Sequence, residues 1–246
     1  MPYLRSEAII LRSTHFQDTG KILNCLTRDH GLVAVLAKGA RSPKSKFMGN
    51  LELFSHVELV YAYKETRQIQ TLCEVNLIAF HQGILIDLDK LALVGQIGWI
   101  LNRCLMECKP LPELFSELLK VMTLVDYCEN SSQQELAYLY FLNAFLKTGG
   151  WGLNFNQCSR CGTPFGQEAV LDWNGSALYC IKCRPDHYRY RRISQTEMQI
   201  LARLDIPSIL TAPRVAQPIY LSLLDIFRQL YQHHLNLLIS NFQSKE

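Results

Sequence analysis

The chain of 246 residues fits one large domain or two ordinary ones, since domains usually contain roughly 100–200 residues. With 48% hydrophobic and 19% charged residues it has enough apolar content for a sizeable core, which excludes a mainly disordered chain. Its longest uncharged apolar run, Leu91 to Asn102, is shorter than the ~20 residues that cross a bilayer, and Glu7 argues against a signal peptide. We therefore expect a cytoplasmic protein without membrane contact.

The formal net charge of +3 is distributed unevenly along the chain. Residues 1–80 carry ten Lys and Arg against seven Asp and Glu, and residues 158–246 also carry ten against seven. Residues 81–157 carry five against eight. Basic ends around an acidic middle indicate a polyanion that binds particular faces.

Residues 4–79 are typical of short strands separated by polar or Gly-containing breaks. The predicted strands are Glu7–Arg12, Lys21–Thr27, Gly31–Lys38, His56–Lys64 and Arg67–Leu77. Five short strands suit a closed barrel, because closure removes exposed sheet edges. We expect an N-terminal OB-fold nucleic-acid-binding domain over residues 1–79, with an SH3-like barrel as the structural alternative.

A basic loop follows the third predicted strand. Residues 38–47 contain four cations and no acid, with Gly39 and Pro43 shaping a turn. Such a loop can follow a phosphate backbone, and Phe47 offers a candidate stacking surface for a base. The alternative is an ordinary solvated loop. Together with two cations of the barrel strands, the candidate DNA-binding residues here are Lys21, Lys38, Arg41, Lys44, Lys46 and Arg67.

From about residue 80 the apolar residues recur at helical spacing, which makes the chain an α+β protein with a helical domain over residues 80–246. The predicted helices are His81–Cys108, Leu111–Cys128, Gln133–Thr148, Met198–Leu204 and Val215–Phe242. Two sequences, Ser132–Glu135 and Ser194–Glu197, have the capping-box pattern. Gly149 and Gly150 favour an end of the helix predicted over Gln133–Thr148, because glycine tolerates the left-handed conformation of a helix C-terminus.

Four cysteines in two CxxC pairs give the most specific signal. Eighteen residues separate Cys158 and Cys161 from Cys180 and Cys183, a spacing typical of a four-thiolate zinc site. The zinc module spans residues 156–192, and a hairpin turning at Asn174-Gly175 joins the two pairs. Because four thiolates leave no open coordination position, we expect one structural Zn²⁺. Two disulfides or a redox CxxC pair are the alternatives.

The remaining five cysteines lie in apolar patterns and are expected to be core residues. They are Cys25, Cys73, Cys104, Cys108 and Cys128.

A second basic segment leaves the zinc module. Residues 182–192 alternate cations with His187, Tyr188 and Tyr190, a pattern that suits nucleic-acid contact and equally suits a strand with its cations in water. The candidate DNA-binding residues of this segment are Arg189, Arg191 and Arg192.

The sequence has no Walker A loop, no GxGxxG, no HExxH and no GxSxG, so no motif predicts an enzyme.

With these elements in order, the chain resembles the bacterial RecO family of DNA repair and recombination mediators. The residues that carry this resemblance are Glu7–Arg12, Asp18–Lys21, Ala37–Arg41, Phe141–Gly152 and the segment from Asn156 to Gly162 that contains the first cysteine pair.

The resemblance implies a non-enzymatic protein that binds single- and double-stranded DNA and anneals complementary strands. It also implies that the protein binds RecR and the acidic C-terminal tail of the single-stranded DNA-binding protein. With these partners it would help RecA replace the single-stranded DNA-binding protein on DNA. The implied location is the cytoplasm, in association with the nucleoid. A competing interpretation is a protein–protein adaptor, whose basic loop binds an acidic peptide without direct DNA binding.

Overall fold

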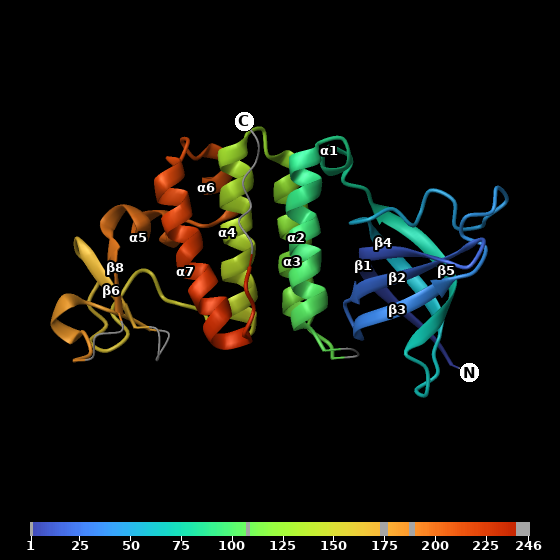
Figure 1. The fold of residues 1–246 in the computed structure, drawn as a ribbon, viewed down its shortest axis with the longest axis horizontal. Helices are drawn as coiled ribbons and strands as arrows, with labels where there is room; N and C mark the ends of the chain where they lie inside the picture. Colours follow the sequence, from blue (N-terminus) through green and yellow to red (C-terminus); the bar gives the residue numbers. More distant parts are fainter. Residues whose placement is uncertain (1, 107–108, 173–176, 187–189, 240–246) are drawn as a thin grey trace. The chain divides into compact units, whose positions relative to one another are not determined.

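The computed structural model describes residues 2–106, 109–172, 177–186 and 190–239 (Figure 1). The chain divides into two compact units, Met1–Asp126 and Tyr127–Glu246. This division lies after the boundary that we predicted between residues 79 and 80, because the helices that follow the barrel belong to the same compact unit as the barrel. The predicted boundary between the two functional domains stays a prediction.

The first unit begins with a closed five-stranded barrel. Its strands are β1 (Tyr3–Phe16), β2 (Gly20–Thr27), β3 (Gly31–Ala37), β4 (His56–Ala62) and β5 (Ile69–Ala79). They follow the order β1-β2-β3-β5-β4, and β4 pairs back with β1 to close the barrel. Among the described strand pairs of the barrel, β3 and β5 run parallel and the others antiparallel. The predicted five strands and the OB-like barrel are confirmed.

Alternate side chains of these strands fill the barrel. Val33 and Val35 of β3 and Leu59 and Tyr61 of β4 are buried together in one apolar cluster. Phe47 joins this cluster and is only 3% exposed. The expectation that Phe47 offers a stacking surface is therefore wrong, because its ring fills the core instead of meeting solvent.

Three helices complete the first unit: α1 (Gln82–Leu85), α2 (Leu88–Cys104) and α3 (Pro112–Tyr127). The single helix predicted over residues 81–108 is divided, because the Asp87 carboxylate accepts hydrogen bonds from the N–H groups of Asp89 and Lys90 and so caps a new helix. Asn102 of α2 contacts the barrel, where its side-chain oxygen accepts a hydrogen bond of 3.1 Å from Asn24.

In its described residues, the second unit combines four helices with a small sheet. Its helices are α4 (Ser131–Thr148), α5 (Gln195–Ala202), α6 (Ile206–Thr211) and α7 (Gln217–Leu235). The strands β6 (Glu168–Asp172), β7 (Ala177–Tyr179) and β8 (Tyr190–Ser194) form an antiparallel sheet in the order β7-β6-β8, and the 3-10 turn η1 (Ile181–Cys183) follows β7. The pairing of β6 with β7 confirms the predicted hairpin, whose turn at Asn174-Gly175 lies outside the described residues.

Helix α4 is the buried centre of this unit. The Tyr231 hydroxyl of α7 donates to the Leu142 carbonyl, and the Gln133 amide donates to the Leu210 carbonyl of α6. The capping box predicted at Ser132–Glu135 is wrong, because the helix starts earlier and Asn130 caps it. Ser132 instead accepts a hydrogen bond from the Val215 N–H.

The remaining helices of this unit agree with the prediction in one feature and differ from it in two. The capping box at Ser194–Glu197 is confirmed by both reciprocal hydrogen bonds. Helix α6 was not predicted, since it has only six residues and contains Pro207. Helix α7 ends at Leu235, where Asn236 adopts a left-handed conformation with φ of 50°. None of the helices in the described ranges is long and apolar enough to cross a membrane.

Candidate nucleic-acid interface and metal centre

Three of the predicted DNA-binding cations lie on neighbouring backbone segments at one end of the barrel. Lys21 on β2 lies opposite Ala37 in the β2–β3 register, next to Lys38. The backbone N–H of Arg41 donates to the Thr19 carbonyl at 2.8 Å, which ties the basic loop to the β1–β2 turn. Lys21, Lys38 and Arg41 therefore come from separate segments but form one group, which we call the basic cluster.

The other three predicted DNA-binding cations of the first unit have different surroundings. The Lys46 amine donates to the Cys73 carbonyl on β5 at 2.7 Å and lies 5.1 Å from the centre of the Phe47 ring. Lys44 is exposed on the same loop, and Arg67 is exposed on the turn between β4 and β5. Lys46 thus has a structural contact, whereas Lys44 and Arg67 keep exposed side chains.

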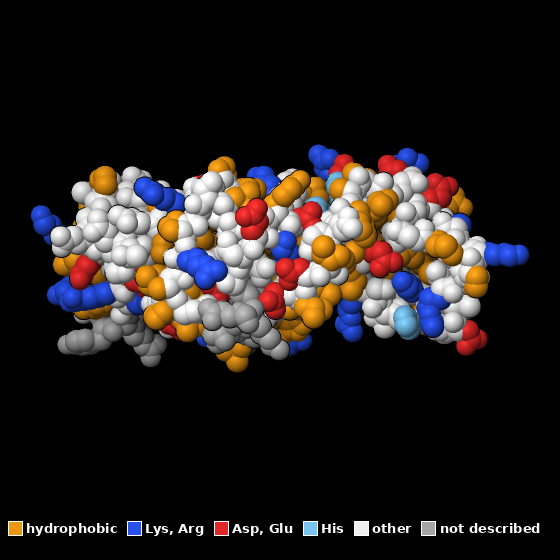
Figure 2. All heavy atoms as spheres, turned by 90° about the horizontal axis from the view of Figure 1, so that it is seen from above, with side chains coloured by type: hydrophobic (Ala, Val, Ile, Leu, Met, Phe, Trp, Pro, Cys, Tyr) orange, Lys and Arg blue, Asp and Glu red, His pale blue; other side chains and the backbone are white. Residues whose placement is uncertain are grey.

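Three other cations of the same unit have carboxylate partners, which these six cations lack among the described residues. Arg5 pairs with Glu58, Arg28 with Glu7, and Lys120 with Glu117. In the part of the chain that the structure describes, none of the six forms an ion pair. Because no described carboxylate occupies these side chains, phosphates can approach the basic cluster without displacing one. On the face drawn in Figure 2, the described Lys and Arg side chains project in small groups and not as one continuous basic surface.

The four predicted metal ligands are brought together. The sulfur atoms of Cys158, Cys161, Cys180 and Cys183 all lie within 4.8 Å of one another. The Sγ atoms of Cys161 and Cys180 are 3.9 Å apart, too far for a disulfide bond of about 2.05 Å. They are close to the roughly 3.8 Å that a tetrahedron with Zn–S bonds of about 2.3 Å requires. The cluster can hold a metal ion, and an all-sulfur donor set fits zinc.

Tight turns produce this geometry. The Gly162 N–H donates to the Cys158 carbonyl at 2.9 Å, and Gly162 has a φ of 69°, a conformation that glycine adopts without steric cost. The Cys183 N–H donates to the Cys180 carbonyl in η1. A hydrogen bond from the Ser159 N–H to the Leu178 carbonyl of β7 ties the first turn to the sheet. Both cysteine pairs are thus fixed to the hairpin that separates them in sequence.

The thiols differ in acidity. Burial raises the pKa of Cys158, but hydrogen bonds from the backbone N–H groups of Cys161, Cys180 and Arg160 outweigh it and lower the pKa to about 6. Hydrogen bonds with Cys180 and Cys161 raise the pKa of Cys183 to about 12. Four adjacent thiols cannot all ionise without a cation, and a divalent metal would supply the missing positive charge.

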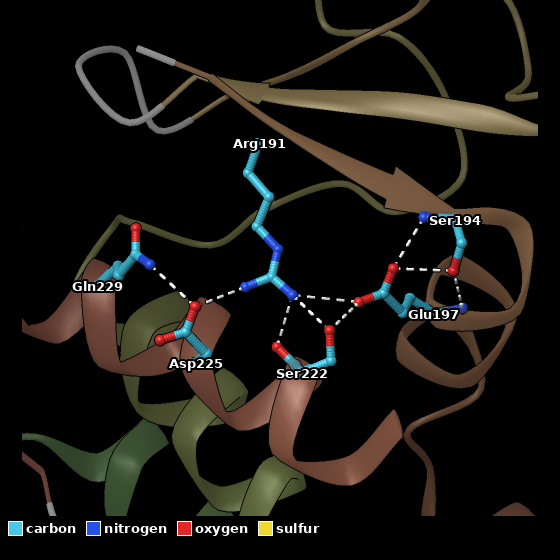
Figure 3. A network of polar contacts seen from close by, with 6 residues as sticks. All are labelled: Arg191, Ser194, Glu197, Ser222, Asp225 and Gln229. Carbon is cyan, nitrogen blue, oxygen red and sulfur yellow. Dashed lines mark hydrogen bonds and ion pairs between the residues drawn. The ribbon is translucent and has the colours of Figure 1, made fainter. Parts of the chain in front are cut away.

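Arg191 of the second basic segment has an internal role (Figure 3). Its guanidinium donates to the Asp225 carboxylate at 2.8 Å, to the Glu197 carboxylate at 3.2 Å and to both oxygens of Ser222. Glu197 also accepts hydrogen bonds from the backbone and hydroxyl of Ser194. The side chain joins β8 to α5 and α7, and only 19% of it is exposed.

Its neighbour Arg192 is different. The Arg192 side chain is 62% exposed and lies 3.6 Å from Glu168. Arg189, the third predicted cation of this segment, lies outside the described residues. Arg192 is therefore accessible to solvent, whereas the Arg191 guanidinium is held by contacts within the protein.

Burial of the five other cysteines is mixed. Cys25 and Cys128 are buried, as expected for core residues, while Cys73 and Cys104 are half-buried. Burial raises the pKa of Cys25 to about 12, so this thiol stays protonated at neutral pH. Cys108 lies outside the described residues.

Sequence reasoning missed a cavity in the second unit. This cavity of about 550 Å³, called here the helical pocket, lies between α5, α6 and the start of α7. Its apolar lining includes Leu136, Ile200, Ile209 and Ile219, and Arg203 and Arg214 also line it. Among the described residues, neither arginine has a carboxylate partner. The only sequence signal for this pocket is the pair Arg203 and Arg214, which lie on either side of the short helix α6, and α6 itself was not predicted.

Comparison with protein families gives two matches that together cover nearly the whole chain. The family described as Recombination protein O N terminal matches residues 1–81, which contain the barrel. The family described as Recombination protein O C terminal matches residues 85–239, which contain helices α2 to α7 and the cysteine cluster. The chain belongs to the RecO family.

Proposed function

We propose that this protein is a recombination mediator that binds single- and double-stranded DNA, anneals complementary strands, and works with RecR to load RecA onto DNA covered by single-stranded DNA-binding protein. The role in DNA repair and recombination follows from membership of the RecO family. The individual steps and partners are our inference. We place this activity in the cytoplasm, at the nucleoid.

The observation that carries the proposal is a set of barrel cations with no carboxylate partners. Lys21, Lys38 and Arg41 lie within one cluster, with Lys44 and Arg67 exposed beyond it. A cation without a carboxylate partner can neutralise a phosphate and release a counterion, which favours binding without regard to base sequence. When two strands are neutralised on one protein, their mutual repulsion falls and pairing becomes easier.

A zinc ion would be held by Cys158, Cys161, Cys180 and Cys183. Bound by four thiolates, it supplies structural cross-linking and no open position for a substrate. The cysteine turns are tied to β7, β7 pairs with β6, and β6 pairs with β8. Through these contacts the metal would hold β8, with exposed Arg192, in place on the second unit. This segment is the second proposed DNA contact, together with Arg189.

The helical pocket suits the acidic tail of the single-stranded DNA-binding protein. Arg203 and Arg214 can pair with carboxylates, while the aliphatic lining can accept apolar side chains of a peptide. Neutralising both arginines, as Arg203→Gln with Arg214→Gln, is expected to weaken a labelled tail peptide about tenfold, at about 0.5–1 kcal/mol for each accessible ion pair. The matched control is Arg184→Gln with Arg192→Gln, which removes equal charge outside the pocket. Equal weakening in both variants would exclude the pocket.

Strand annealing tests the main proposal directly. Two complementary oligonucleotides with donor and acceptor dyes are mixed with and without the protein, and the rate of energy transfer is recorded. We expect faster annealing with the wild-type protein and loss of most of this acceleration when Lys38, Arg41 and Lys44 are changed to Gln. If the protein binds the acidic peptide but neither binds nor anneals DNA, the mediator proposal fails and the adaptor interpretation replaces it.

A further inference from the structure

A small cavity lies on the barrel beside β3. Its volume is about 200 Å³, and its lining includes Leu32 and Ala34 of β3 with Tyr63, Glu65 and Arg67 from the turn between β4 and β5. This volume is smaller than the roughly 300–1,000 Å³ of pockets for drug-sized ligands, so it suits one ring system. We call it the barrel pocket.

The turn that forms one wall of this pocket is held in place by Gln70. The Gln70 amide accepts a hydrogen bond from the Lys64 N–H at 2.8 Å and donates to the carbonyls of Lys64 and Arg67 at 3.1 and 2.6 Å. Gln70 is only 4% exposed. Because the buried side chain fixes the backbone on both sides of the turn, the pocket exists before any ligand binds.

The lining suits a flat heterocycle. Aliphatic side chains of β3 form an apolar surface, and the Tyr63 ring and the Arg67 guanidinium are planar groups that stack on bases. Glu65, Thr66 and Gln68 supply acceptors and donors for the edge of a base. Arg67 has no carboxylate partner among the described residues.

The barrel pocket is also close to the basic cluster. Ala34 in the pocket and Ala37 opposite Lys21 are three residues apart on the same strand, about 10 Å at the rise of a β-strand. We propose that the barrel pocket receives one unpaired nucleobase of a DNA strand whose phosphates lie on Lys21, Lys38 and Arg41. This inference rests on the proposed function and adds a basis for distinguishing single strands from duplex.

The consequence concerns release of the annealed product. A base in a duplex is paired and stacked, so it enters the pocket only after it leaves its partner. The basic cluster contacts both kinds of DNA, but the pocket contacts only single strands. When a complementary strand pairs with the bound one, the base leaves the pocket and the protein loses that contact with its product.

The test compares three ligands by fluorescence anisotropy: a single-stranded oligonucleotide, the same oligonucleotide with abasic positions, and a duplex of equal length. We expect the abasic strand to bind about tenfold more weakly than the intact strand, in keeping with the stacking contribution of one base. Ala34→Phe, which fills the pocket, is expected to weaken the intact strand by a similar factor and to leave duplex binding unchanged.

Arg67→Gln is compared with Arg5→Gln, which removes an ion-paired cation of the same unit. We expect only the first to reduce the difference between the intact and abasic strands. The melting temperature reports whether each variant is folded. If the wild type binds both strands and duplex but treats intact and abasic strands alike, the pocket inference is overturned while the proposed function stands. If it binds none of the three, the proposed function itself fails.

Discussion

At the scale of single residues, adjacent arginines of one strand have opposite roles. Successive side chains of a strand point to opposite faces, so Arg191 meets α5 and α7 while Arg192 meets solvent. The alternation of cations with aromatic residues predicts the same DNA-binding role for Arg191 and Arg192, as for Arg189. Their difference depends on Glu197, Ser222 and Asp225, which lie 6, 31 and 34 residues along the chain from Arg191.

Removing Arg191 should therefore destabilise the second unit. We expect Arg191→Ala to lower the free energy of unfolding by about 2 kcal/mol, because it leaves the buried Glu197 carboxylate and the more exposed Asp225 carboxylate without their charged donor. Arg192→Ala, in which an exposed pair is lost, should cost less than about 0.5 kcal/mol. Urea unfolding of both variants measures the difference, and equal effects would contradict the internal role of Arg191.

The same network makes stability depend on pH. Burial raises the pKa of Glu197, but hydrogen bonds from Ser194 and Ser222, with the Arg191 charge, outweigh it and hold this pKa below its ordinary value. Since the folded-state pKa is lower than the unfolded one, the contribution to stability is present at neutral pH. It declines as the pH falls from the ordinary glutamate pKa through the folded-state pKa. Glu197→Gln should flatten the acid side of a stability–pH curve, and an unchanged acid slope would refute the assignment.

At the scale of elements, the cysteine module shows how local chemistry becomes tertiary structure. Two short turns, the β6–β7 hairpin and β8 are connected in sequence and by hydrogen bonds from Ser159 and along the three strands. Strand β8 leads directly into the capping box of α5, and α5 lines the helical pocket. The cysteine cluster is therefore connected to the helical pocket through β7, β6, β8 and α5.

Metal removal should affect both stability and the helical pocket. We expect a chelator to lower the melting temperature of the protein and to weaken the acidic peptide, with recovery of both when Zn²⁺ is restored. Cys161→Ser should resemble the chelated wild type, whereas Cys104→Ser, at a half-buried cysteine outside the cluster, should respond to the chelator as the wild type does. A melting temperature and peptide affinity unaffected by the chelator would show that no metal stabilises this module.

Elements whose signals are local were the ones predicted from sequence. The barrel strands, the Ser194–Glu197 capping box and the two cysteine turns depend on residues within a few positions of one another. The burial of Phe47, the cap at Asn130 and both pockets depend on contacts between distant segments. Ser132 and Glu135, for example, have the capping-box spacing, but their side chains bond to Val215 and Gln217 instead.

At the scale of the whole molecule, the first unit has several exposed cations for which the described residues supply no carboxylate partner. The second unit has one arginine, Arg191, held by internal contacts and others that line a pocket or meet solvent. Membership of the RecO family and these local geometries support a mediator that holds DNA and protein partners with different surfaces. We propose above all that phosphates bind the cations of the first unit that lack carboxylate partners among the described residues.

The most direct test is the salt dependence of single-stranded DNA binding by three proteins. These are the wild type, the variant with Lys38, Arg41 and Lys44 changed to Gln, and a control with Arg5, Arg28 and Lys120 changed to Gln. Both variants lose three positive charges from the same unit, but the control removes only cations that are paired with carboxylates.

We predict that the slope of log K against log salt falls in magnitude by about 2 in the first variant, at about 0.7 for each phosphate contact on a single strand. The control should keep the wild-type slope. Equal slopes in all three proteins, or equal reductions in both variants, would contradict the account.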